Sequence, residues 1–320
     1  MDFSVIVCTY NRAGNLARCL GALARQEGIG AIEWEVVVVD NNSTDGTRAE
    51  VERLARELPI KIRYAHEGQQ GLNYARNTGV RVSTGTYFSY VDDDIEVSPR
   101  WLASLHRCFV AHDADAVGGR IHLDPGTTLP KWIRDDETKG FLGFQDFGDE
   151  PFAMDGRRRY PYGGNMAFHR RVVERIGHFN PLLGRKGEGR KRSELFKGAE
   201  TDYFHRLADS GPVCIRYEPD AIVYHQVQPF QLRKKYFRTI HSNAGYQRAF
   251  YDDSDFEHTI LGVPRYLYPM LLSNIGRYLK ELSVDGPDVA FRQQMTVGHM
   301  VGTMLGYHKR AQRQRQAQAQ

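Results

Sequence analysis

Three consecutive carboxylates, Asp92, Asp93 and Asp94, directly follow the apolar segment that begins at Tyr87. Neighbouring carboxylates repel one another, and holding them together is costly unless a cation compensates their charge. Divalent ions such as Mg²⁺ take oxygen ligands and commonly link protein carboxylates to the phosphate groups of a substrate. The triplet is therefore a candidate metal and phosphate site, although a solvated acidic turn would have the same sequence.

Two other apolar runs also end in polar side chains. Residues 36–39 are four valines that lead into Asp40, and residues 4–8 lead into Thr9, Tyr10 and Asn11. The carboxyl ends of parallel strands meet at one edge of a sheet, where ligands bind in open α/β folds. The three polar segments are therefore expected to lie side by side.

Strand and helix patterns alternate in the first part of the chain. Short apolar runs, typical of strands buried on both faces, occupy residues 4–8, 36–39, 60–65, 86–91 and 116–121. Helical patterns lie at residues 13–26, 45–57, 71–82 and 99–112. This alternation predicts an α/β fold with a mainly parallel sheet flanked by helices.

The last part of the chain has a different character. Beyond residue 228 the pattern is helical and aromatic, which predicts a C-terminal helical extension over residues 229–308. Residues 309–320 consist mainly of Gln, Ala and Arg without apolar anchors, and we predict that they form a disordered basic tail.

Composition and charge restrict the class of protein. The 320 residues carry 43 Lys and Arg against 39 Asp and Glu, and the basic residues of 309–320 account for the whole net charge of +4. A nucleic-acid partner therefore has no support from the charge. The chain shows neither an export signal nor an uninterrupted apolar span, and its four cysteines are far apart. These features predict a cytoplasmic protein with reduced cysteines.

Seven short segments together resemble a known family. They are residues 4–12, 39–47, 71–79, 92–94, 163–168, 200–202 and 223–225. In this order and spacing they are similar to family 2 of the nucleotide-sugar glycosyltransferases, over about two-thirds of the chain. The resemblance implies a GT-A fold, with residues 1–228 as the nucleotide-sugar-binding and catalytic domain. It also implies inverting transfer of a sugar from a nucleoside diphosphate to an acceptor hydroxyl.

The resemblance assigns the donor site to residues at the strand ends and in one helix. Thr9, Tyr10 and Asp40 would surround the nucleobase, with Asp40 accepting a hydrogen bond from a ring N–H, which favours a UDP-sugar but also admits guanine. Arg76 would approach the diphosphate or the base. The other residues expected to bind the nucleotide-sugar are Asn11, Asn73, Asp92 and Asp93.

The same resemblance implies a metal site and a general base. Asp94 and His225 would hold Mn²⁺ or Mg²⁺; a borderline imidazole suits Mn²⁺ better, and a hydrogen-bonded structural histidine is the alternative. The family usually has Glu and Asp, then a variable residue and a last Asp. In this chain Ala199, Glu200, Thr201 and Asp202 occupy those places, so the first acid is missing and a glutamate stands where the base aspartate normally sits. Glu200 is therefore the expected base and Asp202 the second candidate, and an acidic first helical turn is the structural alternative.

The acceptor side is less constrained by the sequence. Gly163, Gly164 and Asn165 would bring the backbone close to a sugar, although an ordinary tight turn fits them equally, and Trp132 is a candidate for the acceptor groove. A glycan, a lipid-linked sugar or a small molecule would be the acceptor. Residues 230–308 mix cations with aromatic residues, so they either pack as a helical extension or contact a second copy or the inner face of the membrane. A non-catalytic sugar-nucleotide-binding module remains the alternative function.

Overall fold

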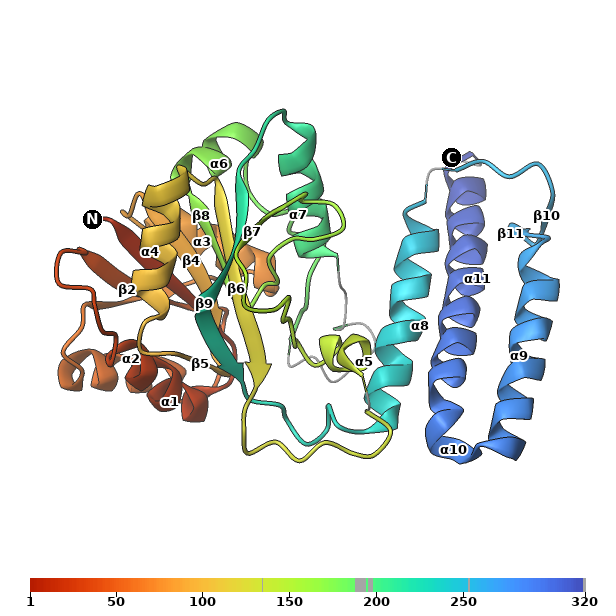
Figure 1. Ribbon diagram of the computed structural model, residues 1–320. Helices are drawn as coiled ribbons and strands as arrows, with labels where there is room; N and C mark the ends of the chain where they lie inside the picture. The colour runs from red at the N-terminus through yellow and green to blue at the C-terminus, as the bar shows by residue number, and fades with distance from the viewer. Residues whose placement is uncertain (134, 188–193, 195–197, 253, 319–320) are drawn as a thin grey trace. The chain divides into compact units, whose positions relative to one another are not determined.

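The computed structural model describes residues 1–133, 135–187, 194, 198–252 and 254–318 (Figure 1). The chain divides into two compact units. The larger unit contains most of the described residues up to Val227, and the smaller one contains the segment that starts at Thr128 and the residues from Gln228 onward.

Four parallel strands form one half of the main sheet in the larger unit. They are β1 (Phe3–Thr9), β2 (Trp34–Asp40), β3 (Ile62–His66) and β4 (Tyr87–Asp92). Strand β1 lies between β2 and β4, and β3 pairs with β2. The register places Thr9 beside Asp40 and Cys8 beside Asp92. The expected meeting of three polar strand ends at one sheet edge is therefore confirmed.

The second half of the sheet mixes strand directions. It consists of β5 (Ile95–Val97), β6 (Ala116–Leu123), β7 (Phe152–Met154), β8 (Met166–His169) and β9 (Ile215–His225). Strand β8 is antiparallel to both β4 and β6, and β6 runs parallel to β9. The short strand β5 pairs with β9, so Ile95 lies opposite His225. This pairing brings the end of β9 to the residues that directly follow the aspartate triplet.

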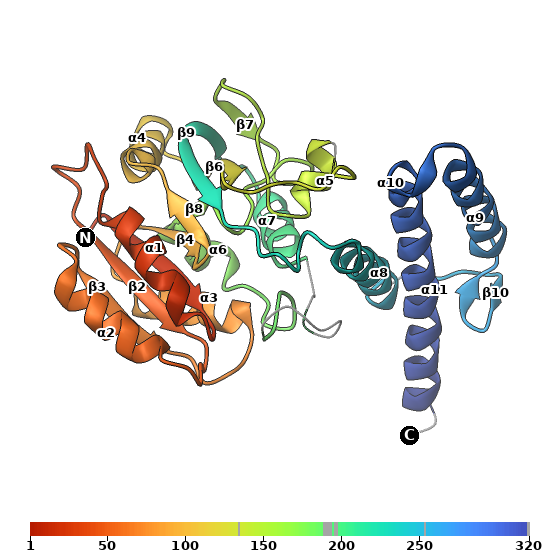
Figure 2. The ribbon, with the colours of Figure 1, turned by 90° about the horizontal axis from the view of Figure 1, so that it is seen from below.

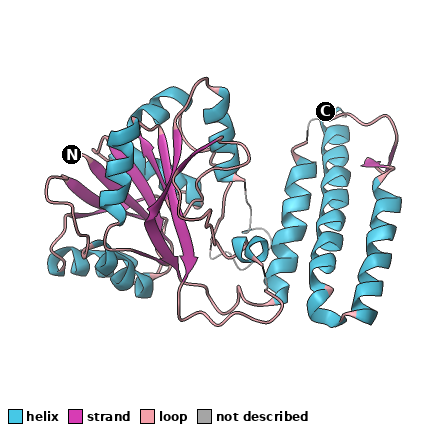
Figure 3. Ribbon diagram, viewed as in Figure 1, coloured by secondary structure: helices cyan, strands magenta, loops and turns pink. Residues whose placement is uncertain are grey.

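Helices cover both faces of the sheet, as Figures 2 and 3 show. One face packs against α1 (Ala13–Leu23), α2 (Thr47–Glu57) and α4 (Trp101–His112). The other face packs against α3 (Leu72–Val82), α6 (Arg170–Ile176) and α7 (Ala199–Asp209). The short helix α5 (Asp136–Gly140) belongs to the connection between β6 and β7. The predicted α/β class, with a mainly parallel sheet flanked by helices and C-terminal helices after it, is confirmed.

The smaller unit is almost entirely helical (Figure 3). Its elements are α8 (Lys234–Phe250), β10 (Thr259–Ile260), β11 (Val263–Pro264), α9 (Leu267–Val284), α10 (Gly286–Val289) and α11 (Phe291–Gln318). Helix α11 lies between α8 and α9 in both ribbon views. Helix α11 approaches α8 closely. A Cβ atom added at Gly245, Gly302 or Gly306 would clash with the backbone of the facing helix, so the absence of side chains at these glycines permits the approach.

The end of the chain differs from the expected disordered tail. Residues 309–318 continue helix α11, while residues 319–320 lie outside the described part. Ala, Gln and Arg are good helix formers, and extending an existing helix avoids the cost of nucleation. Arg310 also stacks on Tyr307 and donates a hydrogen bond of 2.7 Å to the Ser254 carbonyl. Among the described residues, no helix combines the length and apolarity needed to cross a membrane.

Candidate active site

The aspartate triplet is held at the sheet edge by side chains from the first strand and its loop. Asp93 and Asp94 are only 3% and 4% exposed, which excludes the solvated acidic turn. Thr9 donates a hydrogen bond of 2.7 Å from Oγ1 to Asp93. Arg12 donates from Nη1 to both Asp93 and Asp94, each at 2.8 Å. One guanidinium nitrogen therefore links two buried carboxylates.

The three carboxyl groups differ in acidity because their neighbours differ. Burial raises the pKa of Asp93 to about 6, although the charge of Arg12 acts against this shift. Burial also acts on Asp94, but the nearby His225 and Arg12 outweigh it and hold the pKa of this carboxyl below its usual value. The pKa of Asp92 is raised by burial and by the charge of Asp94. Asp94 is thus the member of the triplet that most readily stays ionised.

His225, at the end of β9, faces this ionised carboxylate. Its Nε2 atom lies 3.4 Å from Asp94 Oδ1, and its buried Nδ1 atom has no hydrogen-bond partner among the described residues. The spacing suits two adjacent ligands of one ion with metal–ligand bonds of about 2.1 Å. The oxygen and nitrogen donors fit Mn²⁺ and, less well, Mg²⁺.

These two residues would form an open rather than a closed metal site. Within the described residues, no three or more His, Cys, Asp or Glu side chains gather in a metal-binding group. An ion held by Asp94 and His225 would therefore keep most coordination positions for a substrate or water, as is common for Mg²⁺ beside phosphates.

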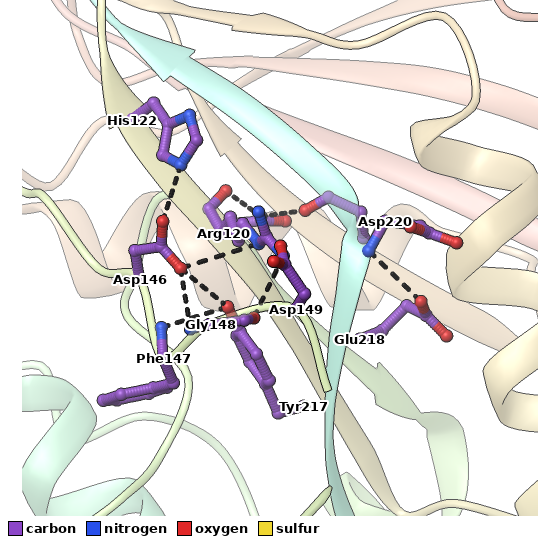
Figure 4. A network of polar contacts seen from close by, with 11 residues as sticks. Arg120, His122, Asp146, Phe147, Gly148, Asp149, Tyr217, Glu218 and Asp220 are labelled. Atoms are coloured by element: carbon purple, nitrogen blue, oxygen red, sulfur yellow. Dashed lines mark hydrogen bonds and ion pairs between the residues drawn. The ribbon is translucent and has the colours of Figure 1, made fainter. Parts of the chain in front are cut away.

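The loop beside His225 is anchored by a polar network (Figure 4). His122 on β6 lies 3.0 Å from Asp146, and Arg120 forms an ion pair with Asp149. Tyr217 on β9 accepts a hydrogen bond of 3.1 Å from the backbone N–H of Phe147. The same loop carries Gly143, where an added Cβ atom would lie 3.4 Å from His225 Nδ1. The network therefore holds the backbone that covers the imidazole.

A second polar group joins α3 to α7. Arg76 Nη2 contacts Glu200 Oε1 at 2.9 Å, and the Arg76 side chain is 2% exposed. The guanidinium lies over the rings of Tyr90 and Phe179, at 5.6 and 5.3 Å from their centres. A Cβ atom added at Gly163 would come within 3.0 Å of both charged groups. The missing side chain at Gly163 therefore makes room for this ion pair.

The environments of Glu200 and Asp202 separate the two candidate bases. Burial would raise the pKa of Glu200, but the charge of Arg76 outweighs it, so the pKa lies below the usual value. Asp202 pairs instead with Arg206, one turn along the same helix, at 3.0 Å. The structure therefore brings Glu200, and not Asp202, to Arg76 and Gly163.

The diglycine connects the two polar groups. Gly163 borders the Arg76–Glu200 pair, and a Cβ atom added at the neighbouring Gly164 would lie 3.4 Å from Asp92 Oδ2. The candidate base and the aspartate triplet are thus parts of one site at the carboxyl edge of the sheet.

The residues expected around the nucleobase lie at the ends of β1 and β2. Asp40 accepts hydrogen bonds of 2.9 Å from the Ser43 backbone N–H and from the Tyr64 hydroxyl. Asn11 has a left-handed backbone with φ of 50°, and its side chain accepts a hydrogen bond of 2.8 Å from the Thr44 backbone N–H. Tyr10, between Thr9 and Asn11, is partly exposed at this edge. The loops that follow β1 and β2 are therefore hydrogen-bonded to each other at the place where the resemblance expects the nucleobase.

Two residues expected at the nucleotide have structural contacts instead. Arg76 is buried in its ion pair and is not presented at the surface of the site. Asn73 is fully buried and donates to the backbone carbonyls of Asn180 and Leu183 at 2.8 and 3.1 Å. The amide nitrogen of Asn73 is therefore used inside the protein.

The acceptor-side candidates are divided between the two units. Asn165 is fully buried, donates to the carbonyls of Arg120 and Ala221, and accepts a hydrogen bond of 2.8 Å from the Trp101 indole. It cannot contact an acceptor, because its amide is used inside the larger unit. Trp132 belongs to the smaller unit, where it packs edge-on against Phe237 and Phe291.

Arg12 is the main residue of the site that the sequence analysis left out. The available signal was a basic residue shortly after one strand, next to another strand that ends in acidic residues. The sequence predicted that these strand ends lie side by side, but the pairing of Arg12 with Asp93 and Asp94 came only with the side-chain contacts.

Comparison with known proteins identifies the family. The family model described as "Glycosyl transferase family 2" matches residues 4–177. The chain is 31% identical to the succinoglycan biosynthesis protein ExoM of Rhizobium meliloti, over 71% of this chain and 67% of that protein. It is 25% identical to the glucosyl-dolichyl phosphate glucuronosyltransferase of Haloferax volcanii, over 96% of this chain and 95% of that protein.

Solved structures support the fold independently. Residues 1–349 of S. aureus TarS in complex with UDP-GlcNAc align with a TM-score of 0.54 and 16% identity, covering 99% of this chain and 92% of that one. The mannosyltransferase PcManGT of Pyrobaculum calidifontis, in complex with GDP-Man and Mn²⁺, aligns with a TM-score of 0.58 and 18% identity, covering 94% and 85%. The sheet edge, its carboxylates and these matches together show that the chain belongs to glycosyl transferase family 2 and is a GT-A glycosyltransferase.

Proposed function

We propose that this glycosyltransferase is metal-dependent and inverting, and that it transfers a sugar from a UDP-sugar to an acceptor hydroxyl with Glu200 as general base. The observation that carries the proposal is the diglycine at residues 163–164. It brings an ionised carboxylate at Gly163 and the first residue of the aspartate triplet at Gly164 to two consecutive residues without side chains. A base held close to a diphosphate site is what a displacement at a sugar carbon requires.

Each residue has a distinct part in this mechanism. Glu200 accepts the proton of the acceptor hydroxyl, and Arg76 keeps its carboxylate ionised. Asp94 and His225 would hold the divalent ion, which would supply positive charge to neutralise the leaving diphosphate. Asp40, Thr9, Tyr10 and Asn11 orient the nucleoside, while Asp92 orients the ribose or donor sugar.

The comparisons support the donor class but not one particular sugar. The TarS structure contains UDP-GlcNAc, and the PcManGT structure contains GDP-Man and Mn²⁺. The carboxylate of Asp40 suits the ring N–H of uracil, and a guanine ring offers a similar donor. The names of the relatives indicate a polysaccharide or a lipid-linked sugar as acceptor, and a small molecule is the remaining class. We propose residues 1–228 as the catalytic domain of a cytoplasmic enzyme, with residues 230–308 contacting acceptor, membrane or a second copy.

Replacing Asp94 with alanine tests the metal site. We expect about a 10³-fold loss of kcat, because charge stabilisation at a leaving group contributes several kcal/mol. Release of nucleoside diphosphate from UDP- and GDP-sugars should be measured with Mn²⁺, with Mg²⁺ and with EDTA. Asp209→Ala, which removes an exposed carboxylate paired with Arg157, is the matched control.

The same assay separates the proposal from its alternative. Full turnover by Asp94→Ala would contradict the metal assignment. Tight nucleotide-sugar binding by the wild type, without transfer or donor hydrolysis for any donor and acceptor, would instead indicate a non-catalytic binding module.

A further inference from the structure

We propose that Arg12 is a positioning residue that orients Asp94 for the divalent ion. The inference rests on the proposed metal dependence and adds a residue to it. Arg12 follows the predicted nucleobase loop, but its side chain turns to the aspartate triplet rather than to that loop. Its role is therefore exerted through Asp94.

The two carboxylate oxygens of Asp94 contact different neighbours. Oδ2 accepts a hydrogen bond of 2.8 Å from Arg12, and Oδ1 lies 3.4 Å from His225 Nε2. Rotation of the carboxylate would break the first contact, so Arg12 keeps Oδ1 directed at the imidazole. Removing the partner that orients a metal ligand commonly lowers metal affinity by about 10- to 100-fold.

Arg12 is itself held in place by Asp93 and by the loop that precedes it. Asp93 Oδ1 accepts a second hydrogen bond of 2.8 Å from the same nitrogen, and Asp93 is fixed in turn by Thr9. The left-handed backbone of Asn11 turns the chain directly before Arg12, and the Ser43 hydroxyl accepts a hydrogen bond of 2.9 Å from the Asn11 N–H. The Arg12 side chain is 28% exposed, so most of it is packed. A side chain held this firmly can fix another.

Electrostatics alone predicts the opposite effect of removing Arg12. A cation close to the site repels Mn²⁺, so deleting its charge would strengthen Mn²⁺ binding unless the arginine also orients a ligand. Weaker binding after the deletion is therefore the reverse of what relief of this repulsion predicts.

The test is Mn²⁺ binding measured by electron paramagnetic resonance of the free ion, without nucleotide, with UDP and with GDP. Arg12→Met should weaken Mn²⁺ binding about tenfold or more, and Arg12→Lys, which retains a cationic donor, should stay within about threefold of the wild type. Arg18→Met is the matched control, because Arg18 carries the same charge on α1 and pairs with Glu96 and Asp124 instead. Thermal unfolding checks each variant, and Arg12→Gln replaces Arg12→Met if that variant does not fold.

The outcomes distinguish this inference from the function on which it rests. Unchanged or tighter Mn²⁺ binding by the neutral Arg12 variant, beside normal binding by the wild type, overturns the role of Arg12 alone. An equal loss in Arg18→Met overturns it as well, because the effect would then follow charge and not contact. Absence of Mn²⁺ binding to the wild type under all three conditions overturns both this inference and the proposed metal dependence.

Discussion

Replacing Glu200 with glutamine is expected to lower kcat by about 10²- to 10⁴-fold, the range that general base catalysis contributes. Glutamine has nearly the same shape and can still accept a hydrogen bond from Arg76, but it cannot take up the proton of an acceptor hydroxyl. The KM for the nucleotide-sugar should therefore change little. Initial rates of nucleoside diphosphate release at saturating donor and acceptor measure the effect.

Asp202→Asn is the matched control for this experiment. Asp202 lies on the same helical turn, and its carboxylate pairs with Arg206 at 3.0 Å. We expect kcat within about threefold of the wild type, because this carboxylate does not contact Arg76 or Gly163. Loss of a partly exposed ion pair within one helix also costs little stability. A large loss in Asp202→Asn together with normal turnover in Glu200→Gln would reverse the assignment of the base.

The second large effect is expected for Gly163→Ala. The added methyl group would come within 3.0 Å of Glu200 Oε1 and Arg76 Nη2, so one of them must move. Arg76 is packed between Tyr90 and Phe179 and is 2% exposed, whereas Glu200 is 26% exposed. The carboxylate is therefore the group that is displaced, and we expect about a 10²-fold loss of kcat from the misplaced base.

The pH dependence of this variant tests the same ion pair. In the wild type Arg76 keeps the pKa of Glu200 below its usual value, so the base stays active until the pH falls well into the acid range. Separation from Arg76 leaves burial as the main influence, which raises the pKa. The acid limb of the kcat profile should therefore move to higher pH in Gly163→Ala.

Gly276→Ala provides the control for a glycine replacement. An added Cβ atom at Gly276 meets nothing within 4 Å, and the residue lies inside helix α9. Its kcat and pH profile should match those of the wild type. Normal activity of Gly163→Ala, with an unshifted acid limb, would contradict the proposed dependence of Glu200 on Arg76.

The strand-end residues could be predicted from the sequence because their signals are local. A run of valines that ends in Asp40, or an apolar run that ends in Asp92, indicates a buried strand and its edge without knowledge of the fold. Parallel pairing then places these edges together. The register of β1 with β2 and β4 agrees with that prediction.

The contact partners of buried side chains could not be predicted from such local sequence signals. Arg76 in a helix looks the same whether it faces solvent, a phosphate or Glu200, which lies 124 positions further along the chain. Asn165 resembles a residue beside a sugar until the contacts with Trp101, Arg120 and Ala221 are known. Both roles depend on contacts between segments far apart in sequence, and no periodicity reports those contacts.

The helical end of the chain shows a second limit. The composition of residues 309–318 lacks apolar anchors, but a helix that is already nucleated needs few of them to continue. Arg310 supplies contacts through its guanidinium, which stacks on Tyr307. Composition alone therefore underestimates order where long basic side chains pack on aromatic rings.

The central claim is a single displacement in which Glu200 acts as a base rather than as a nucleophile. The direct test is proton NMR of the sugar that donor hydrolysis releases from UDP-α-glucose, or from another α-linked donor that the enzyme accepts. The anomeric coupling constant is measured early, before the two anomers equilibrate in water. One displacement inverts the anomeric centre, so the account predicts a β-configured product. An α-configured first product would indicate two successive displacements and would contradict the role of Glu200 as the base.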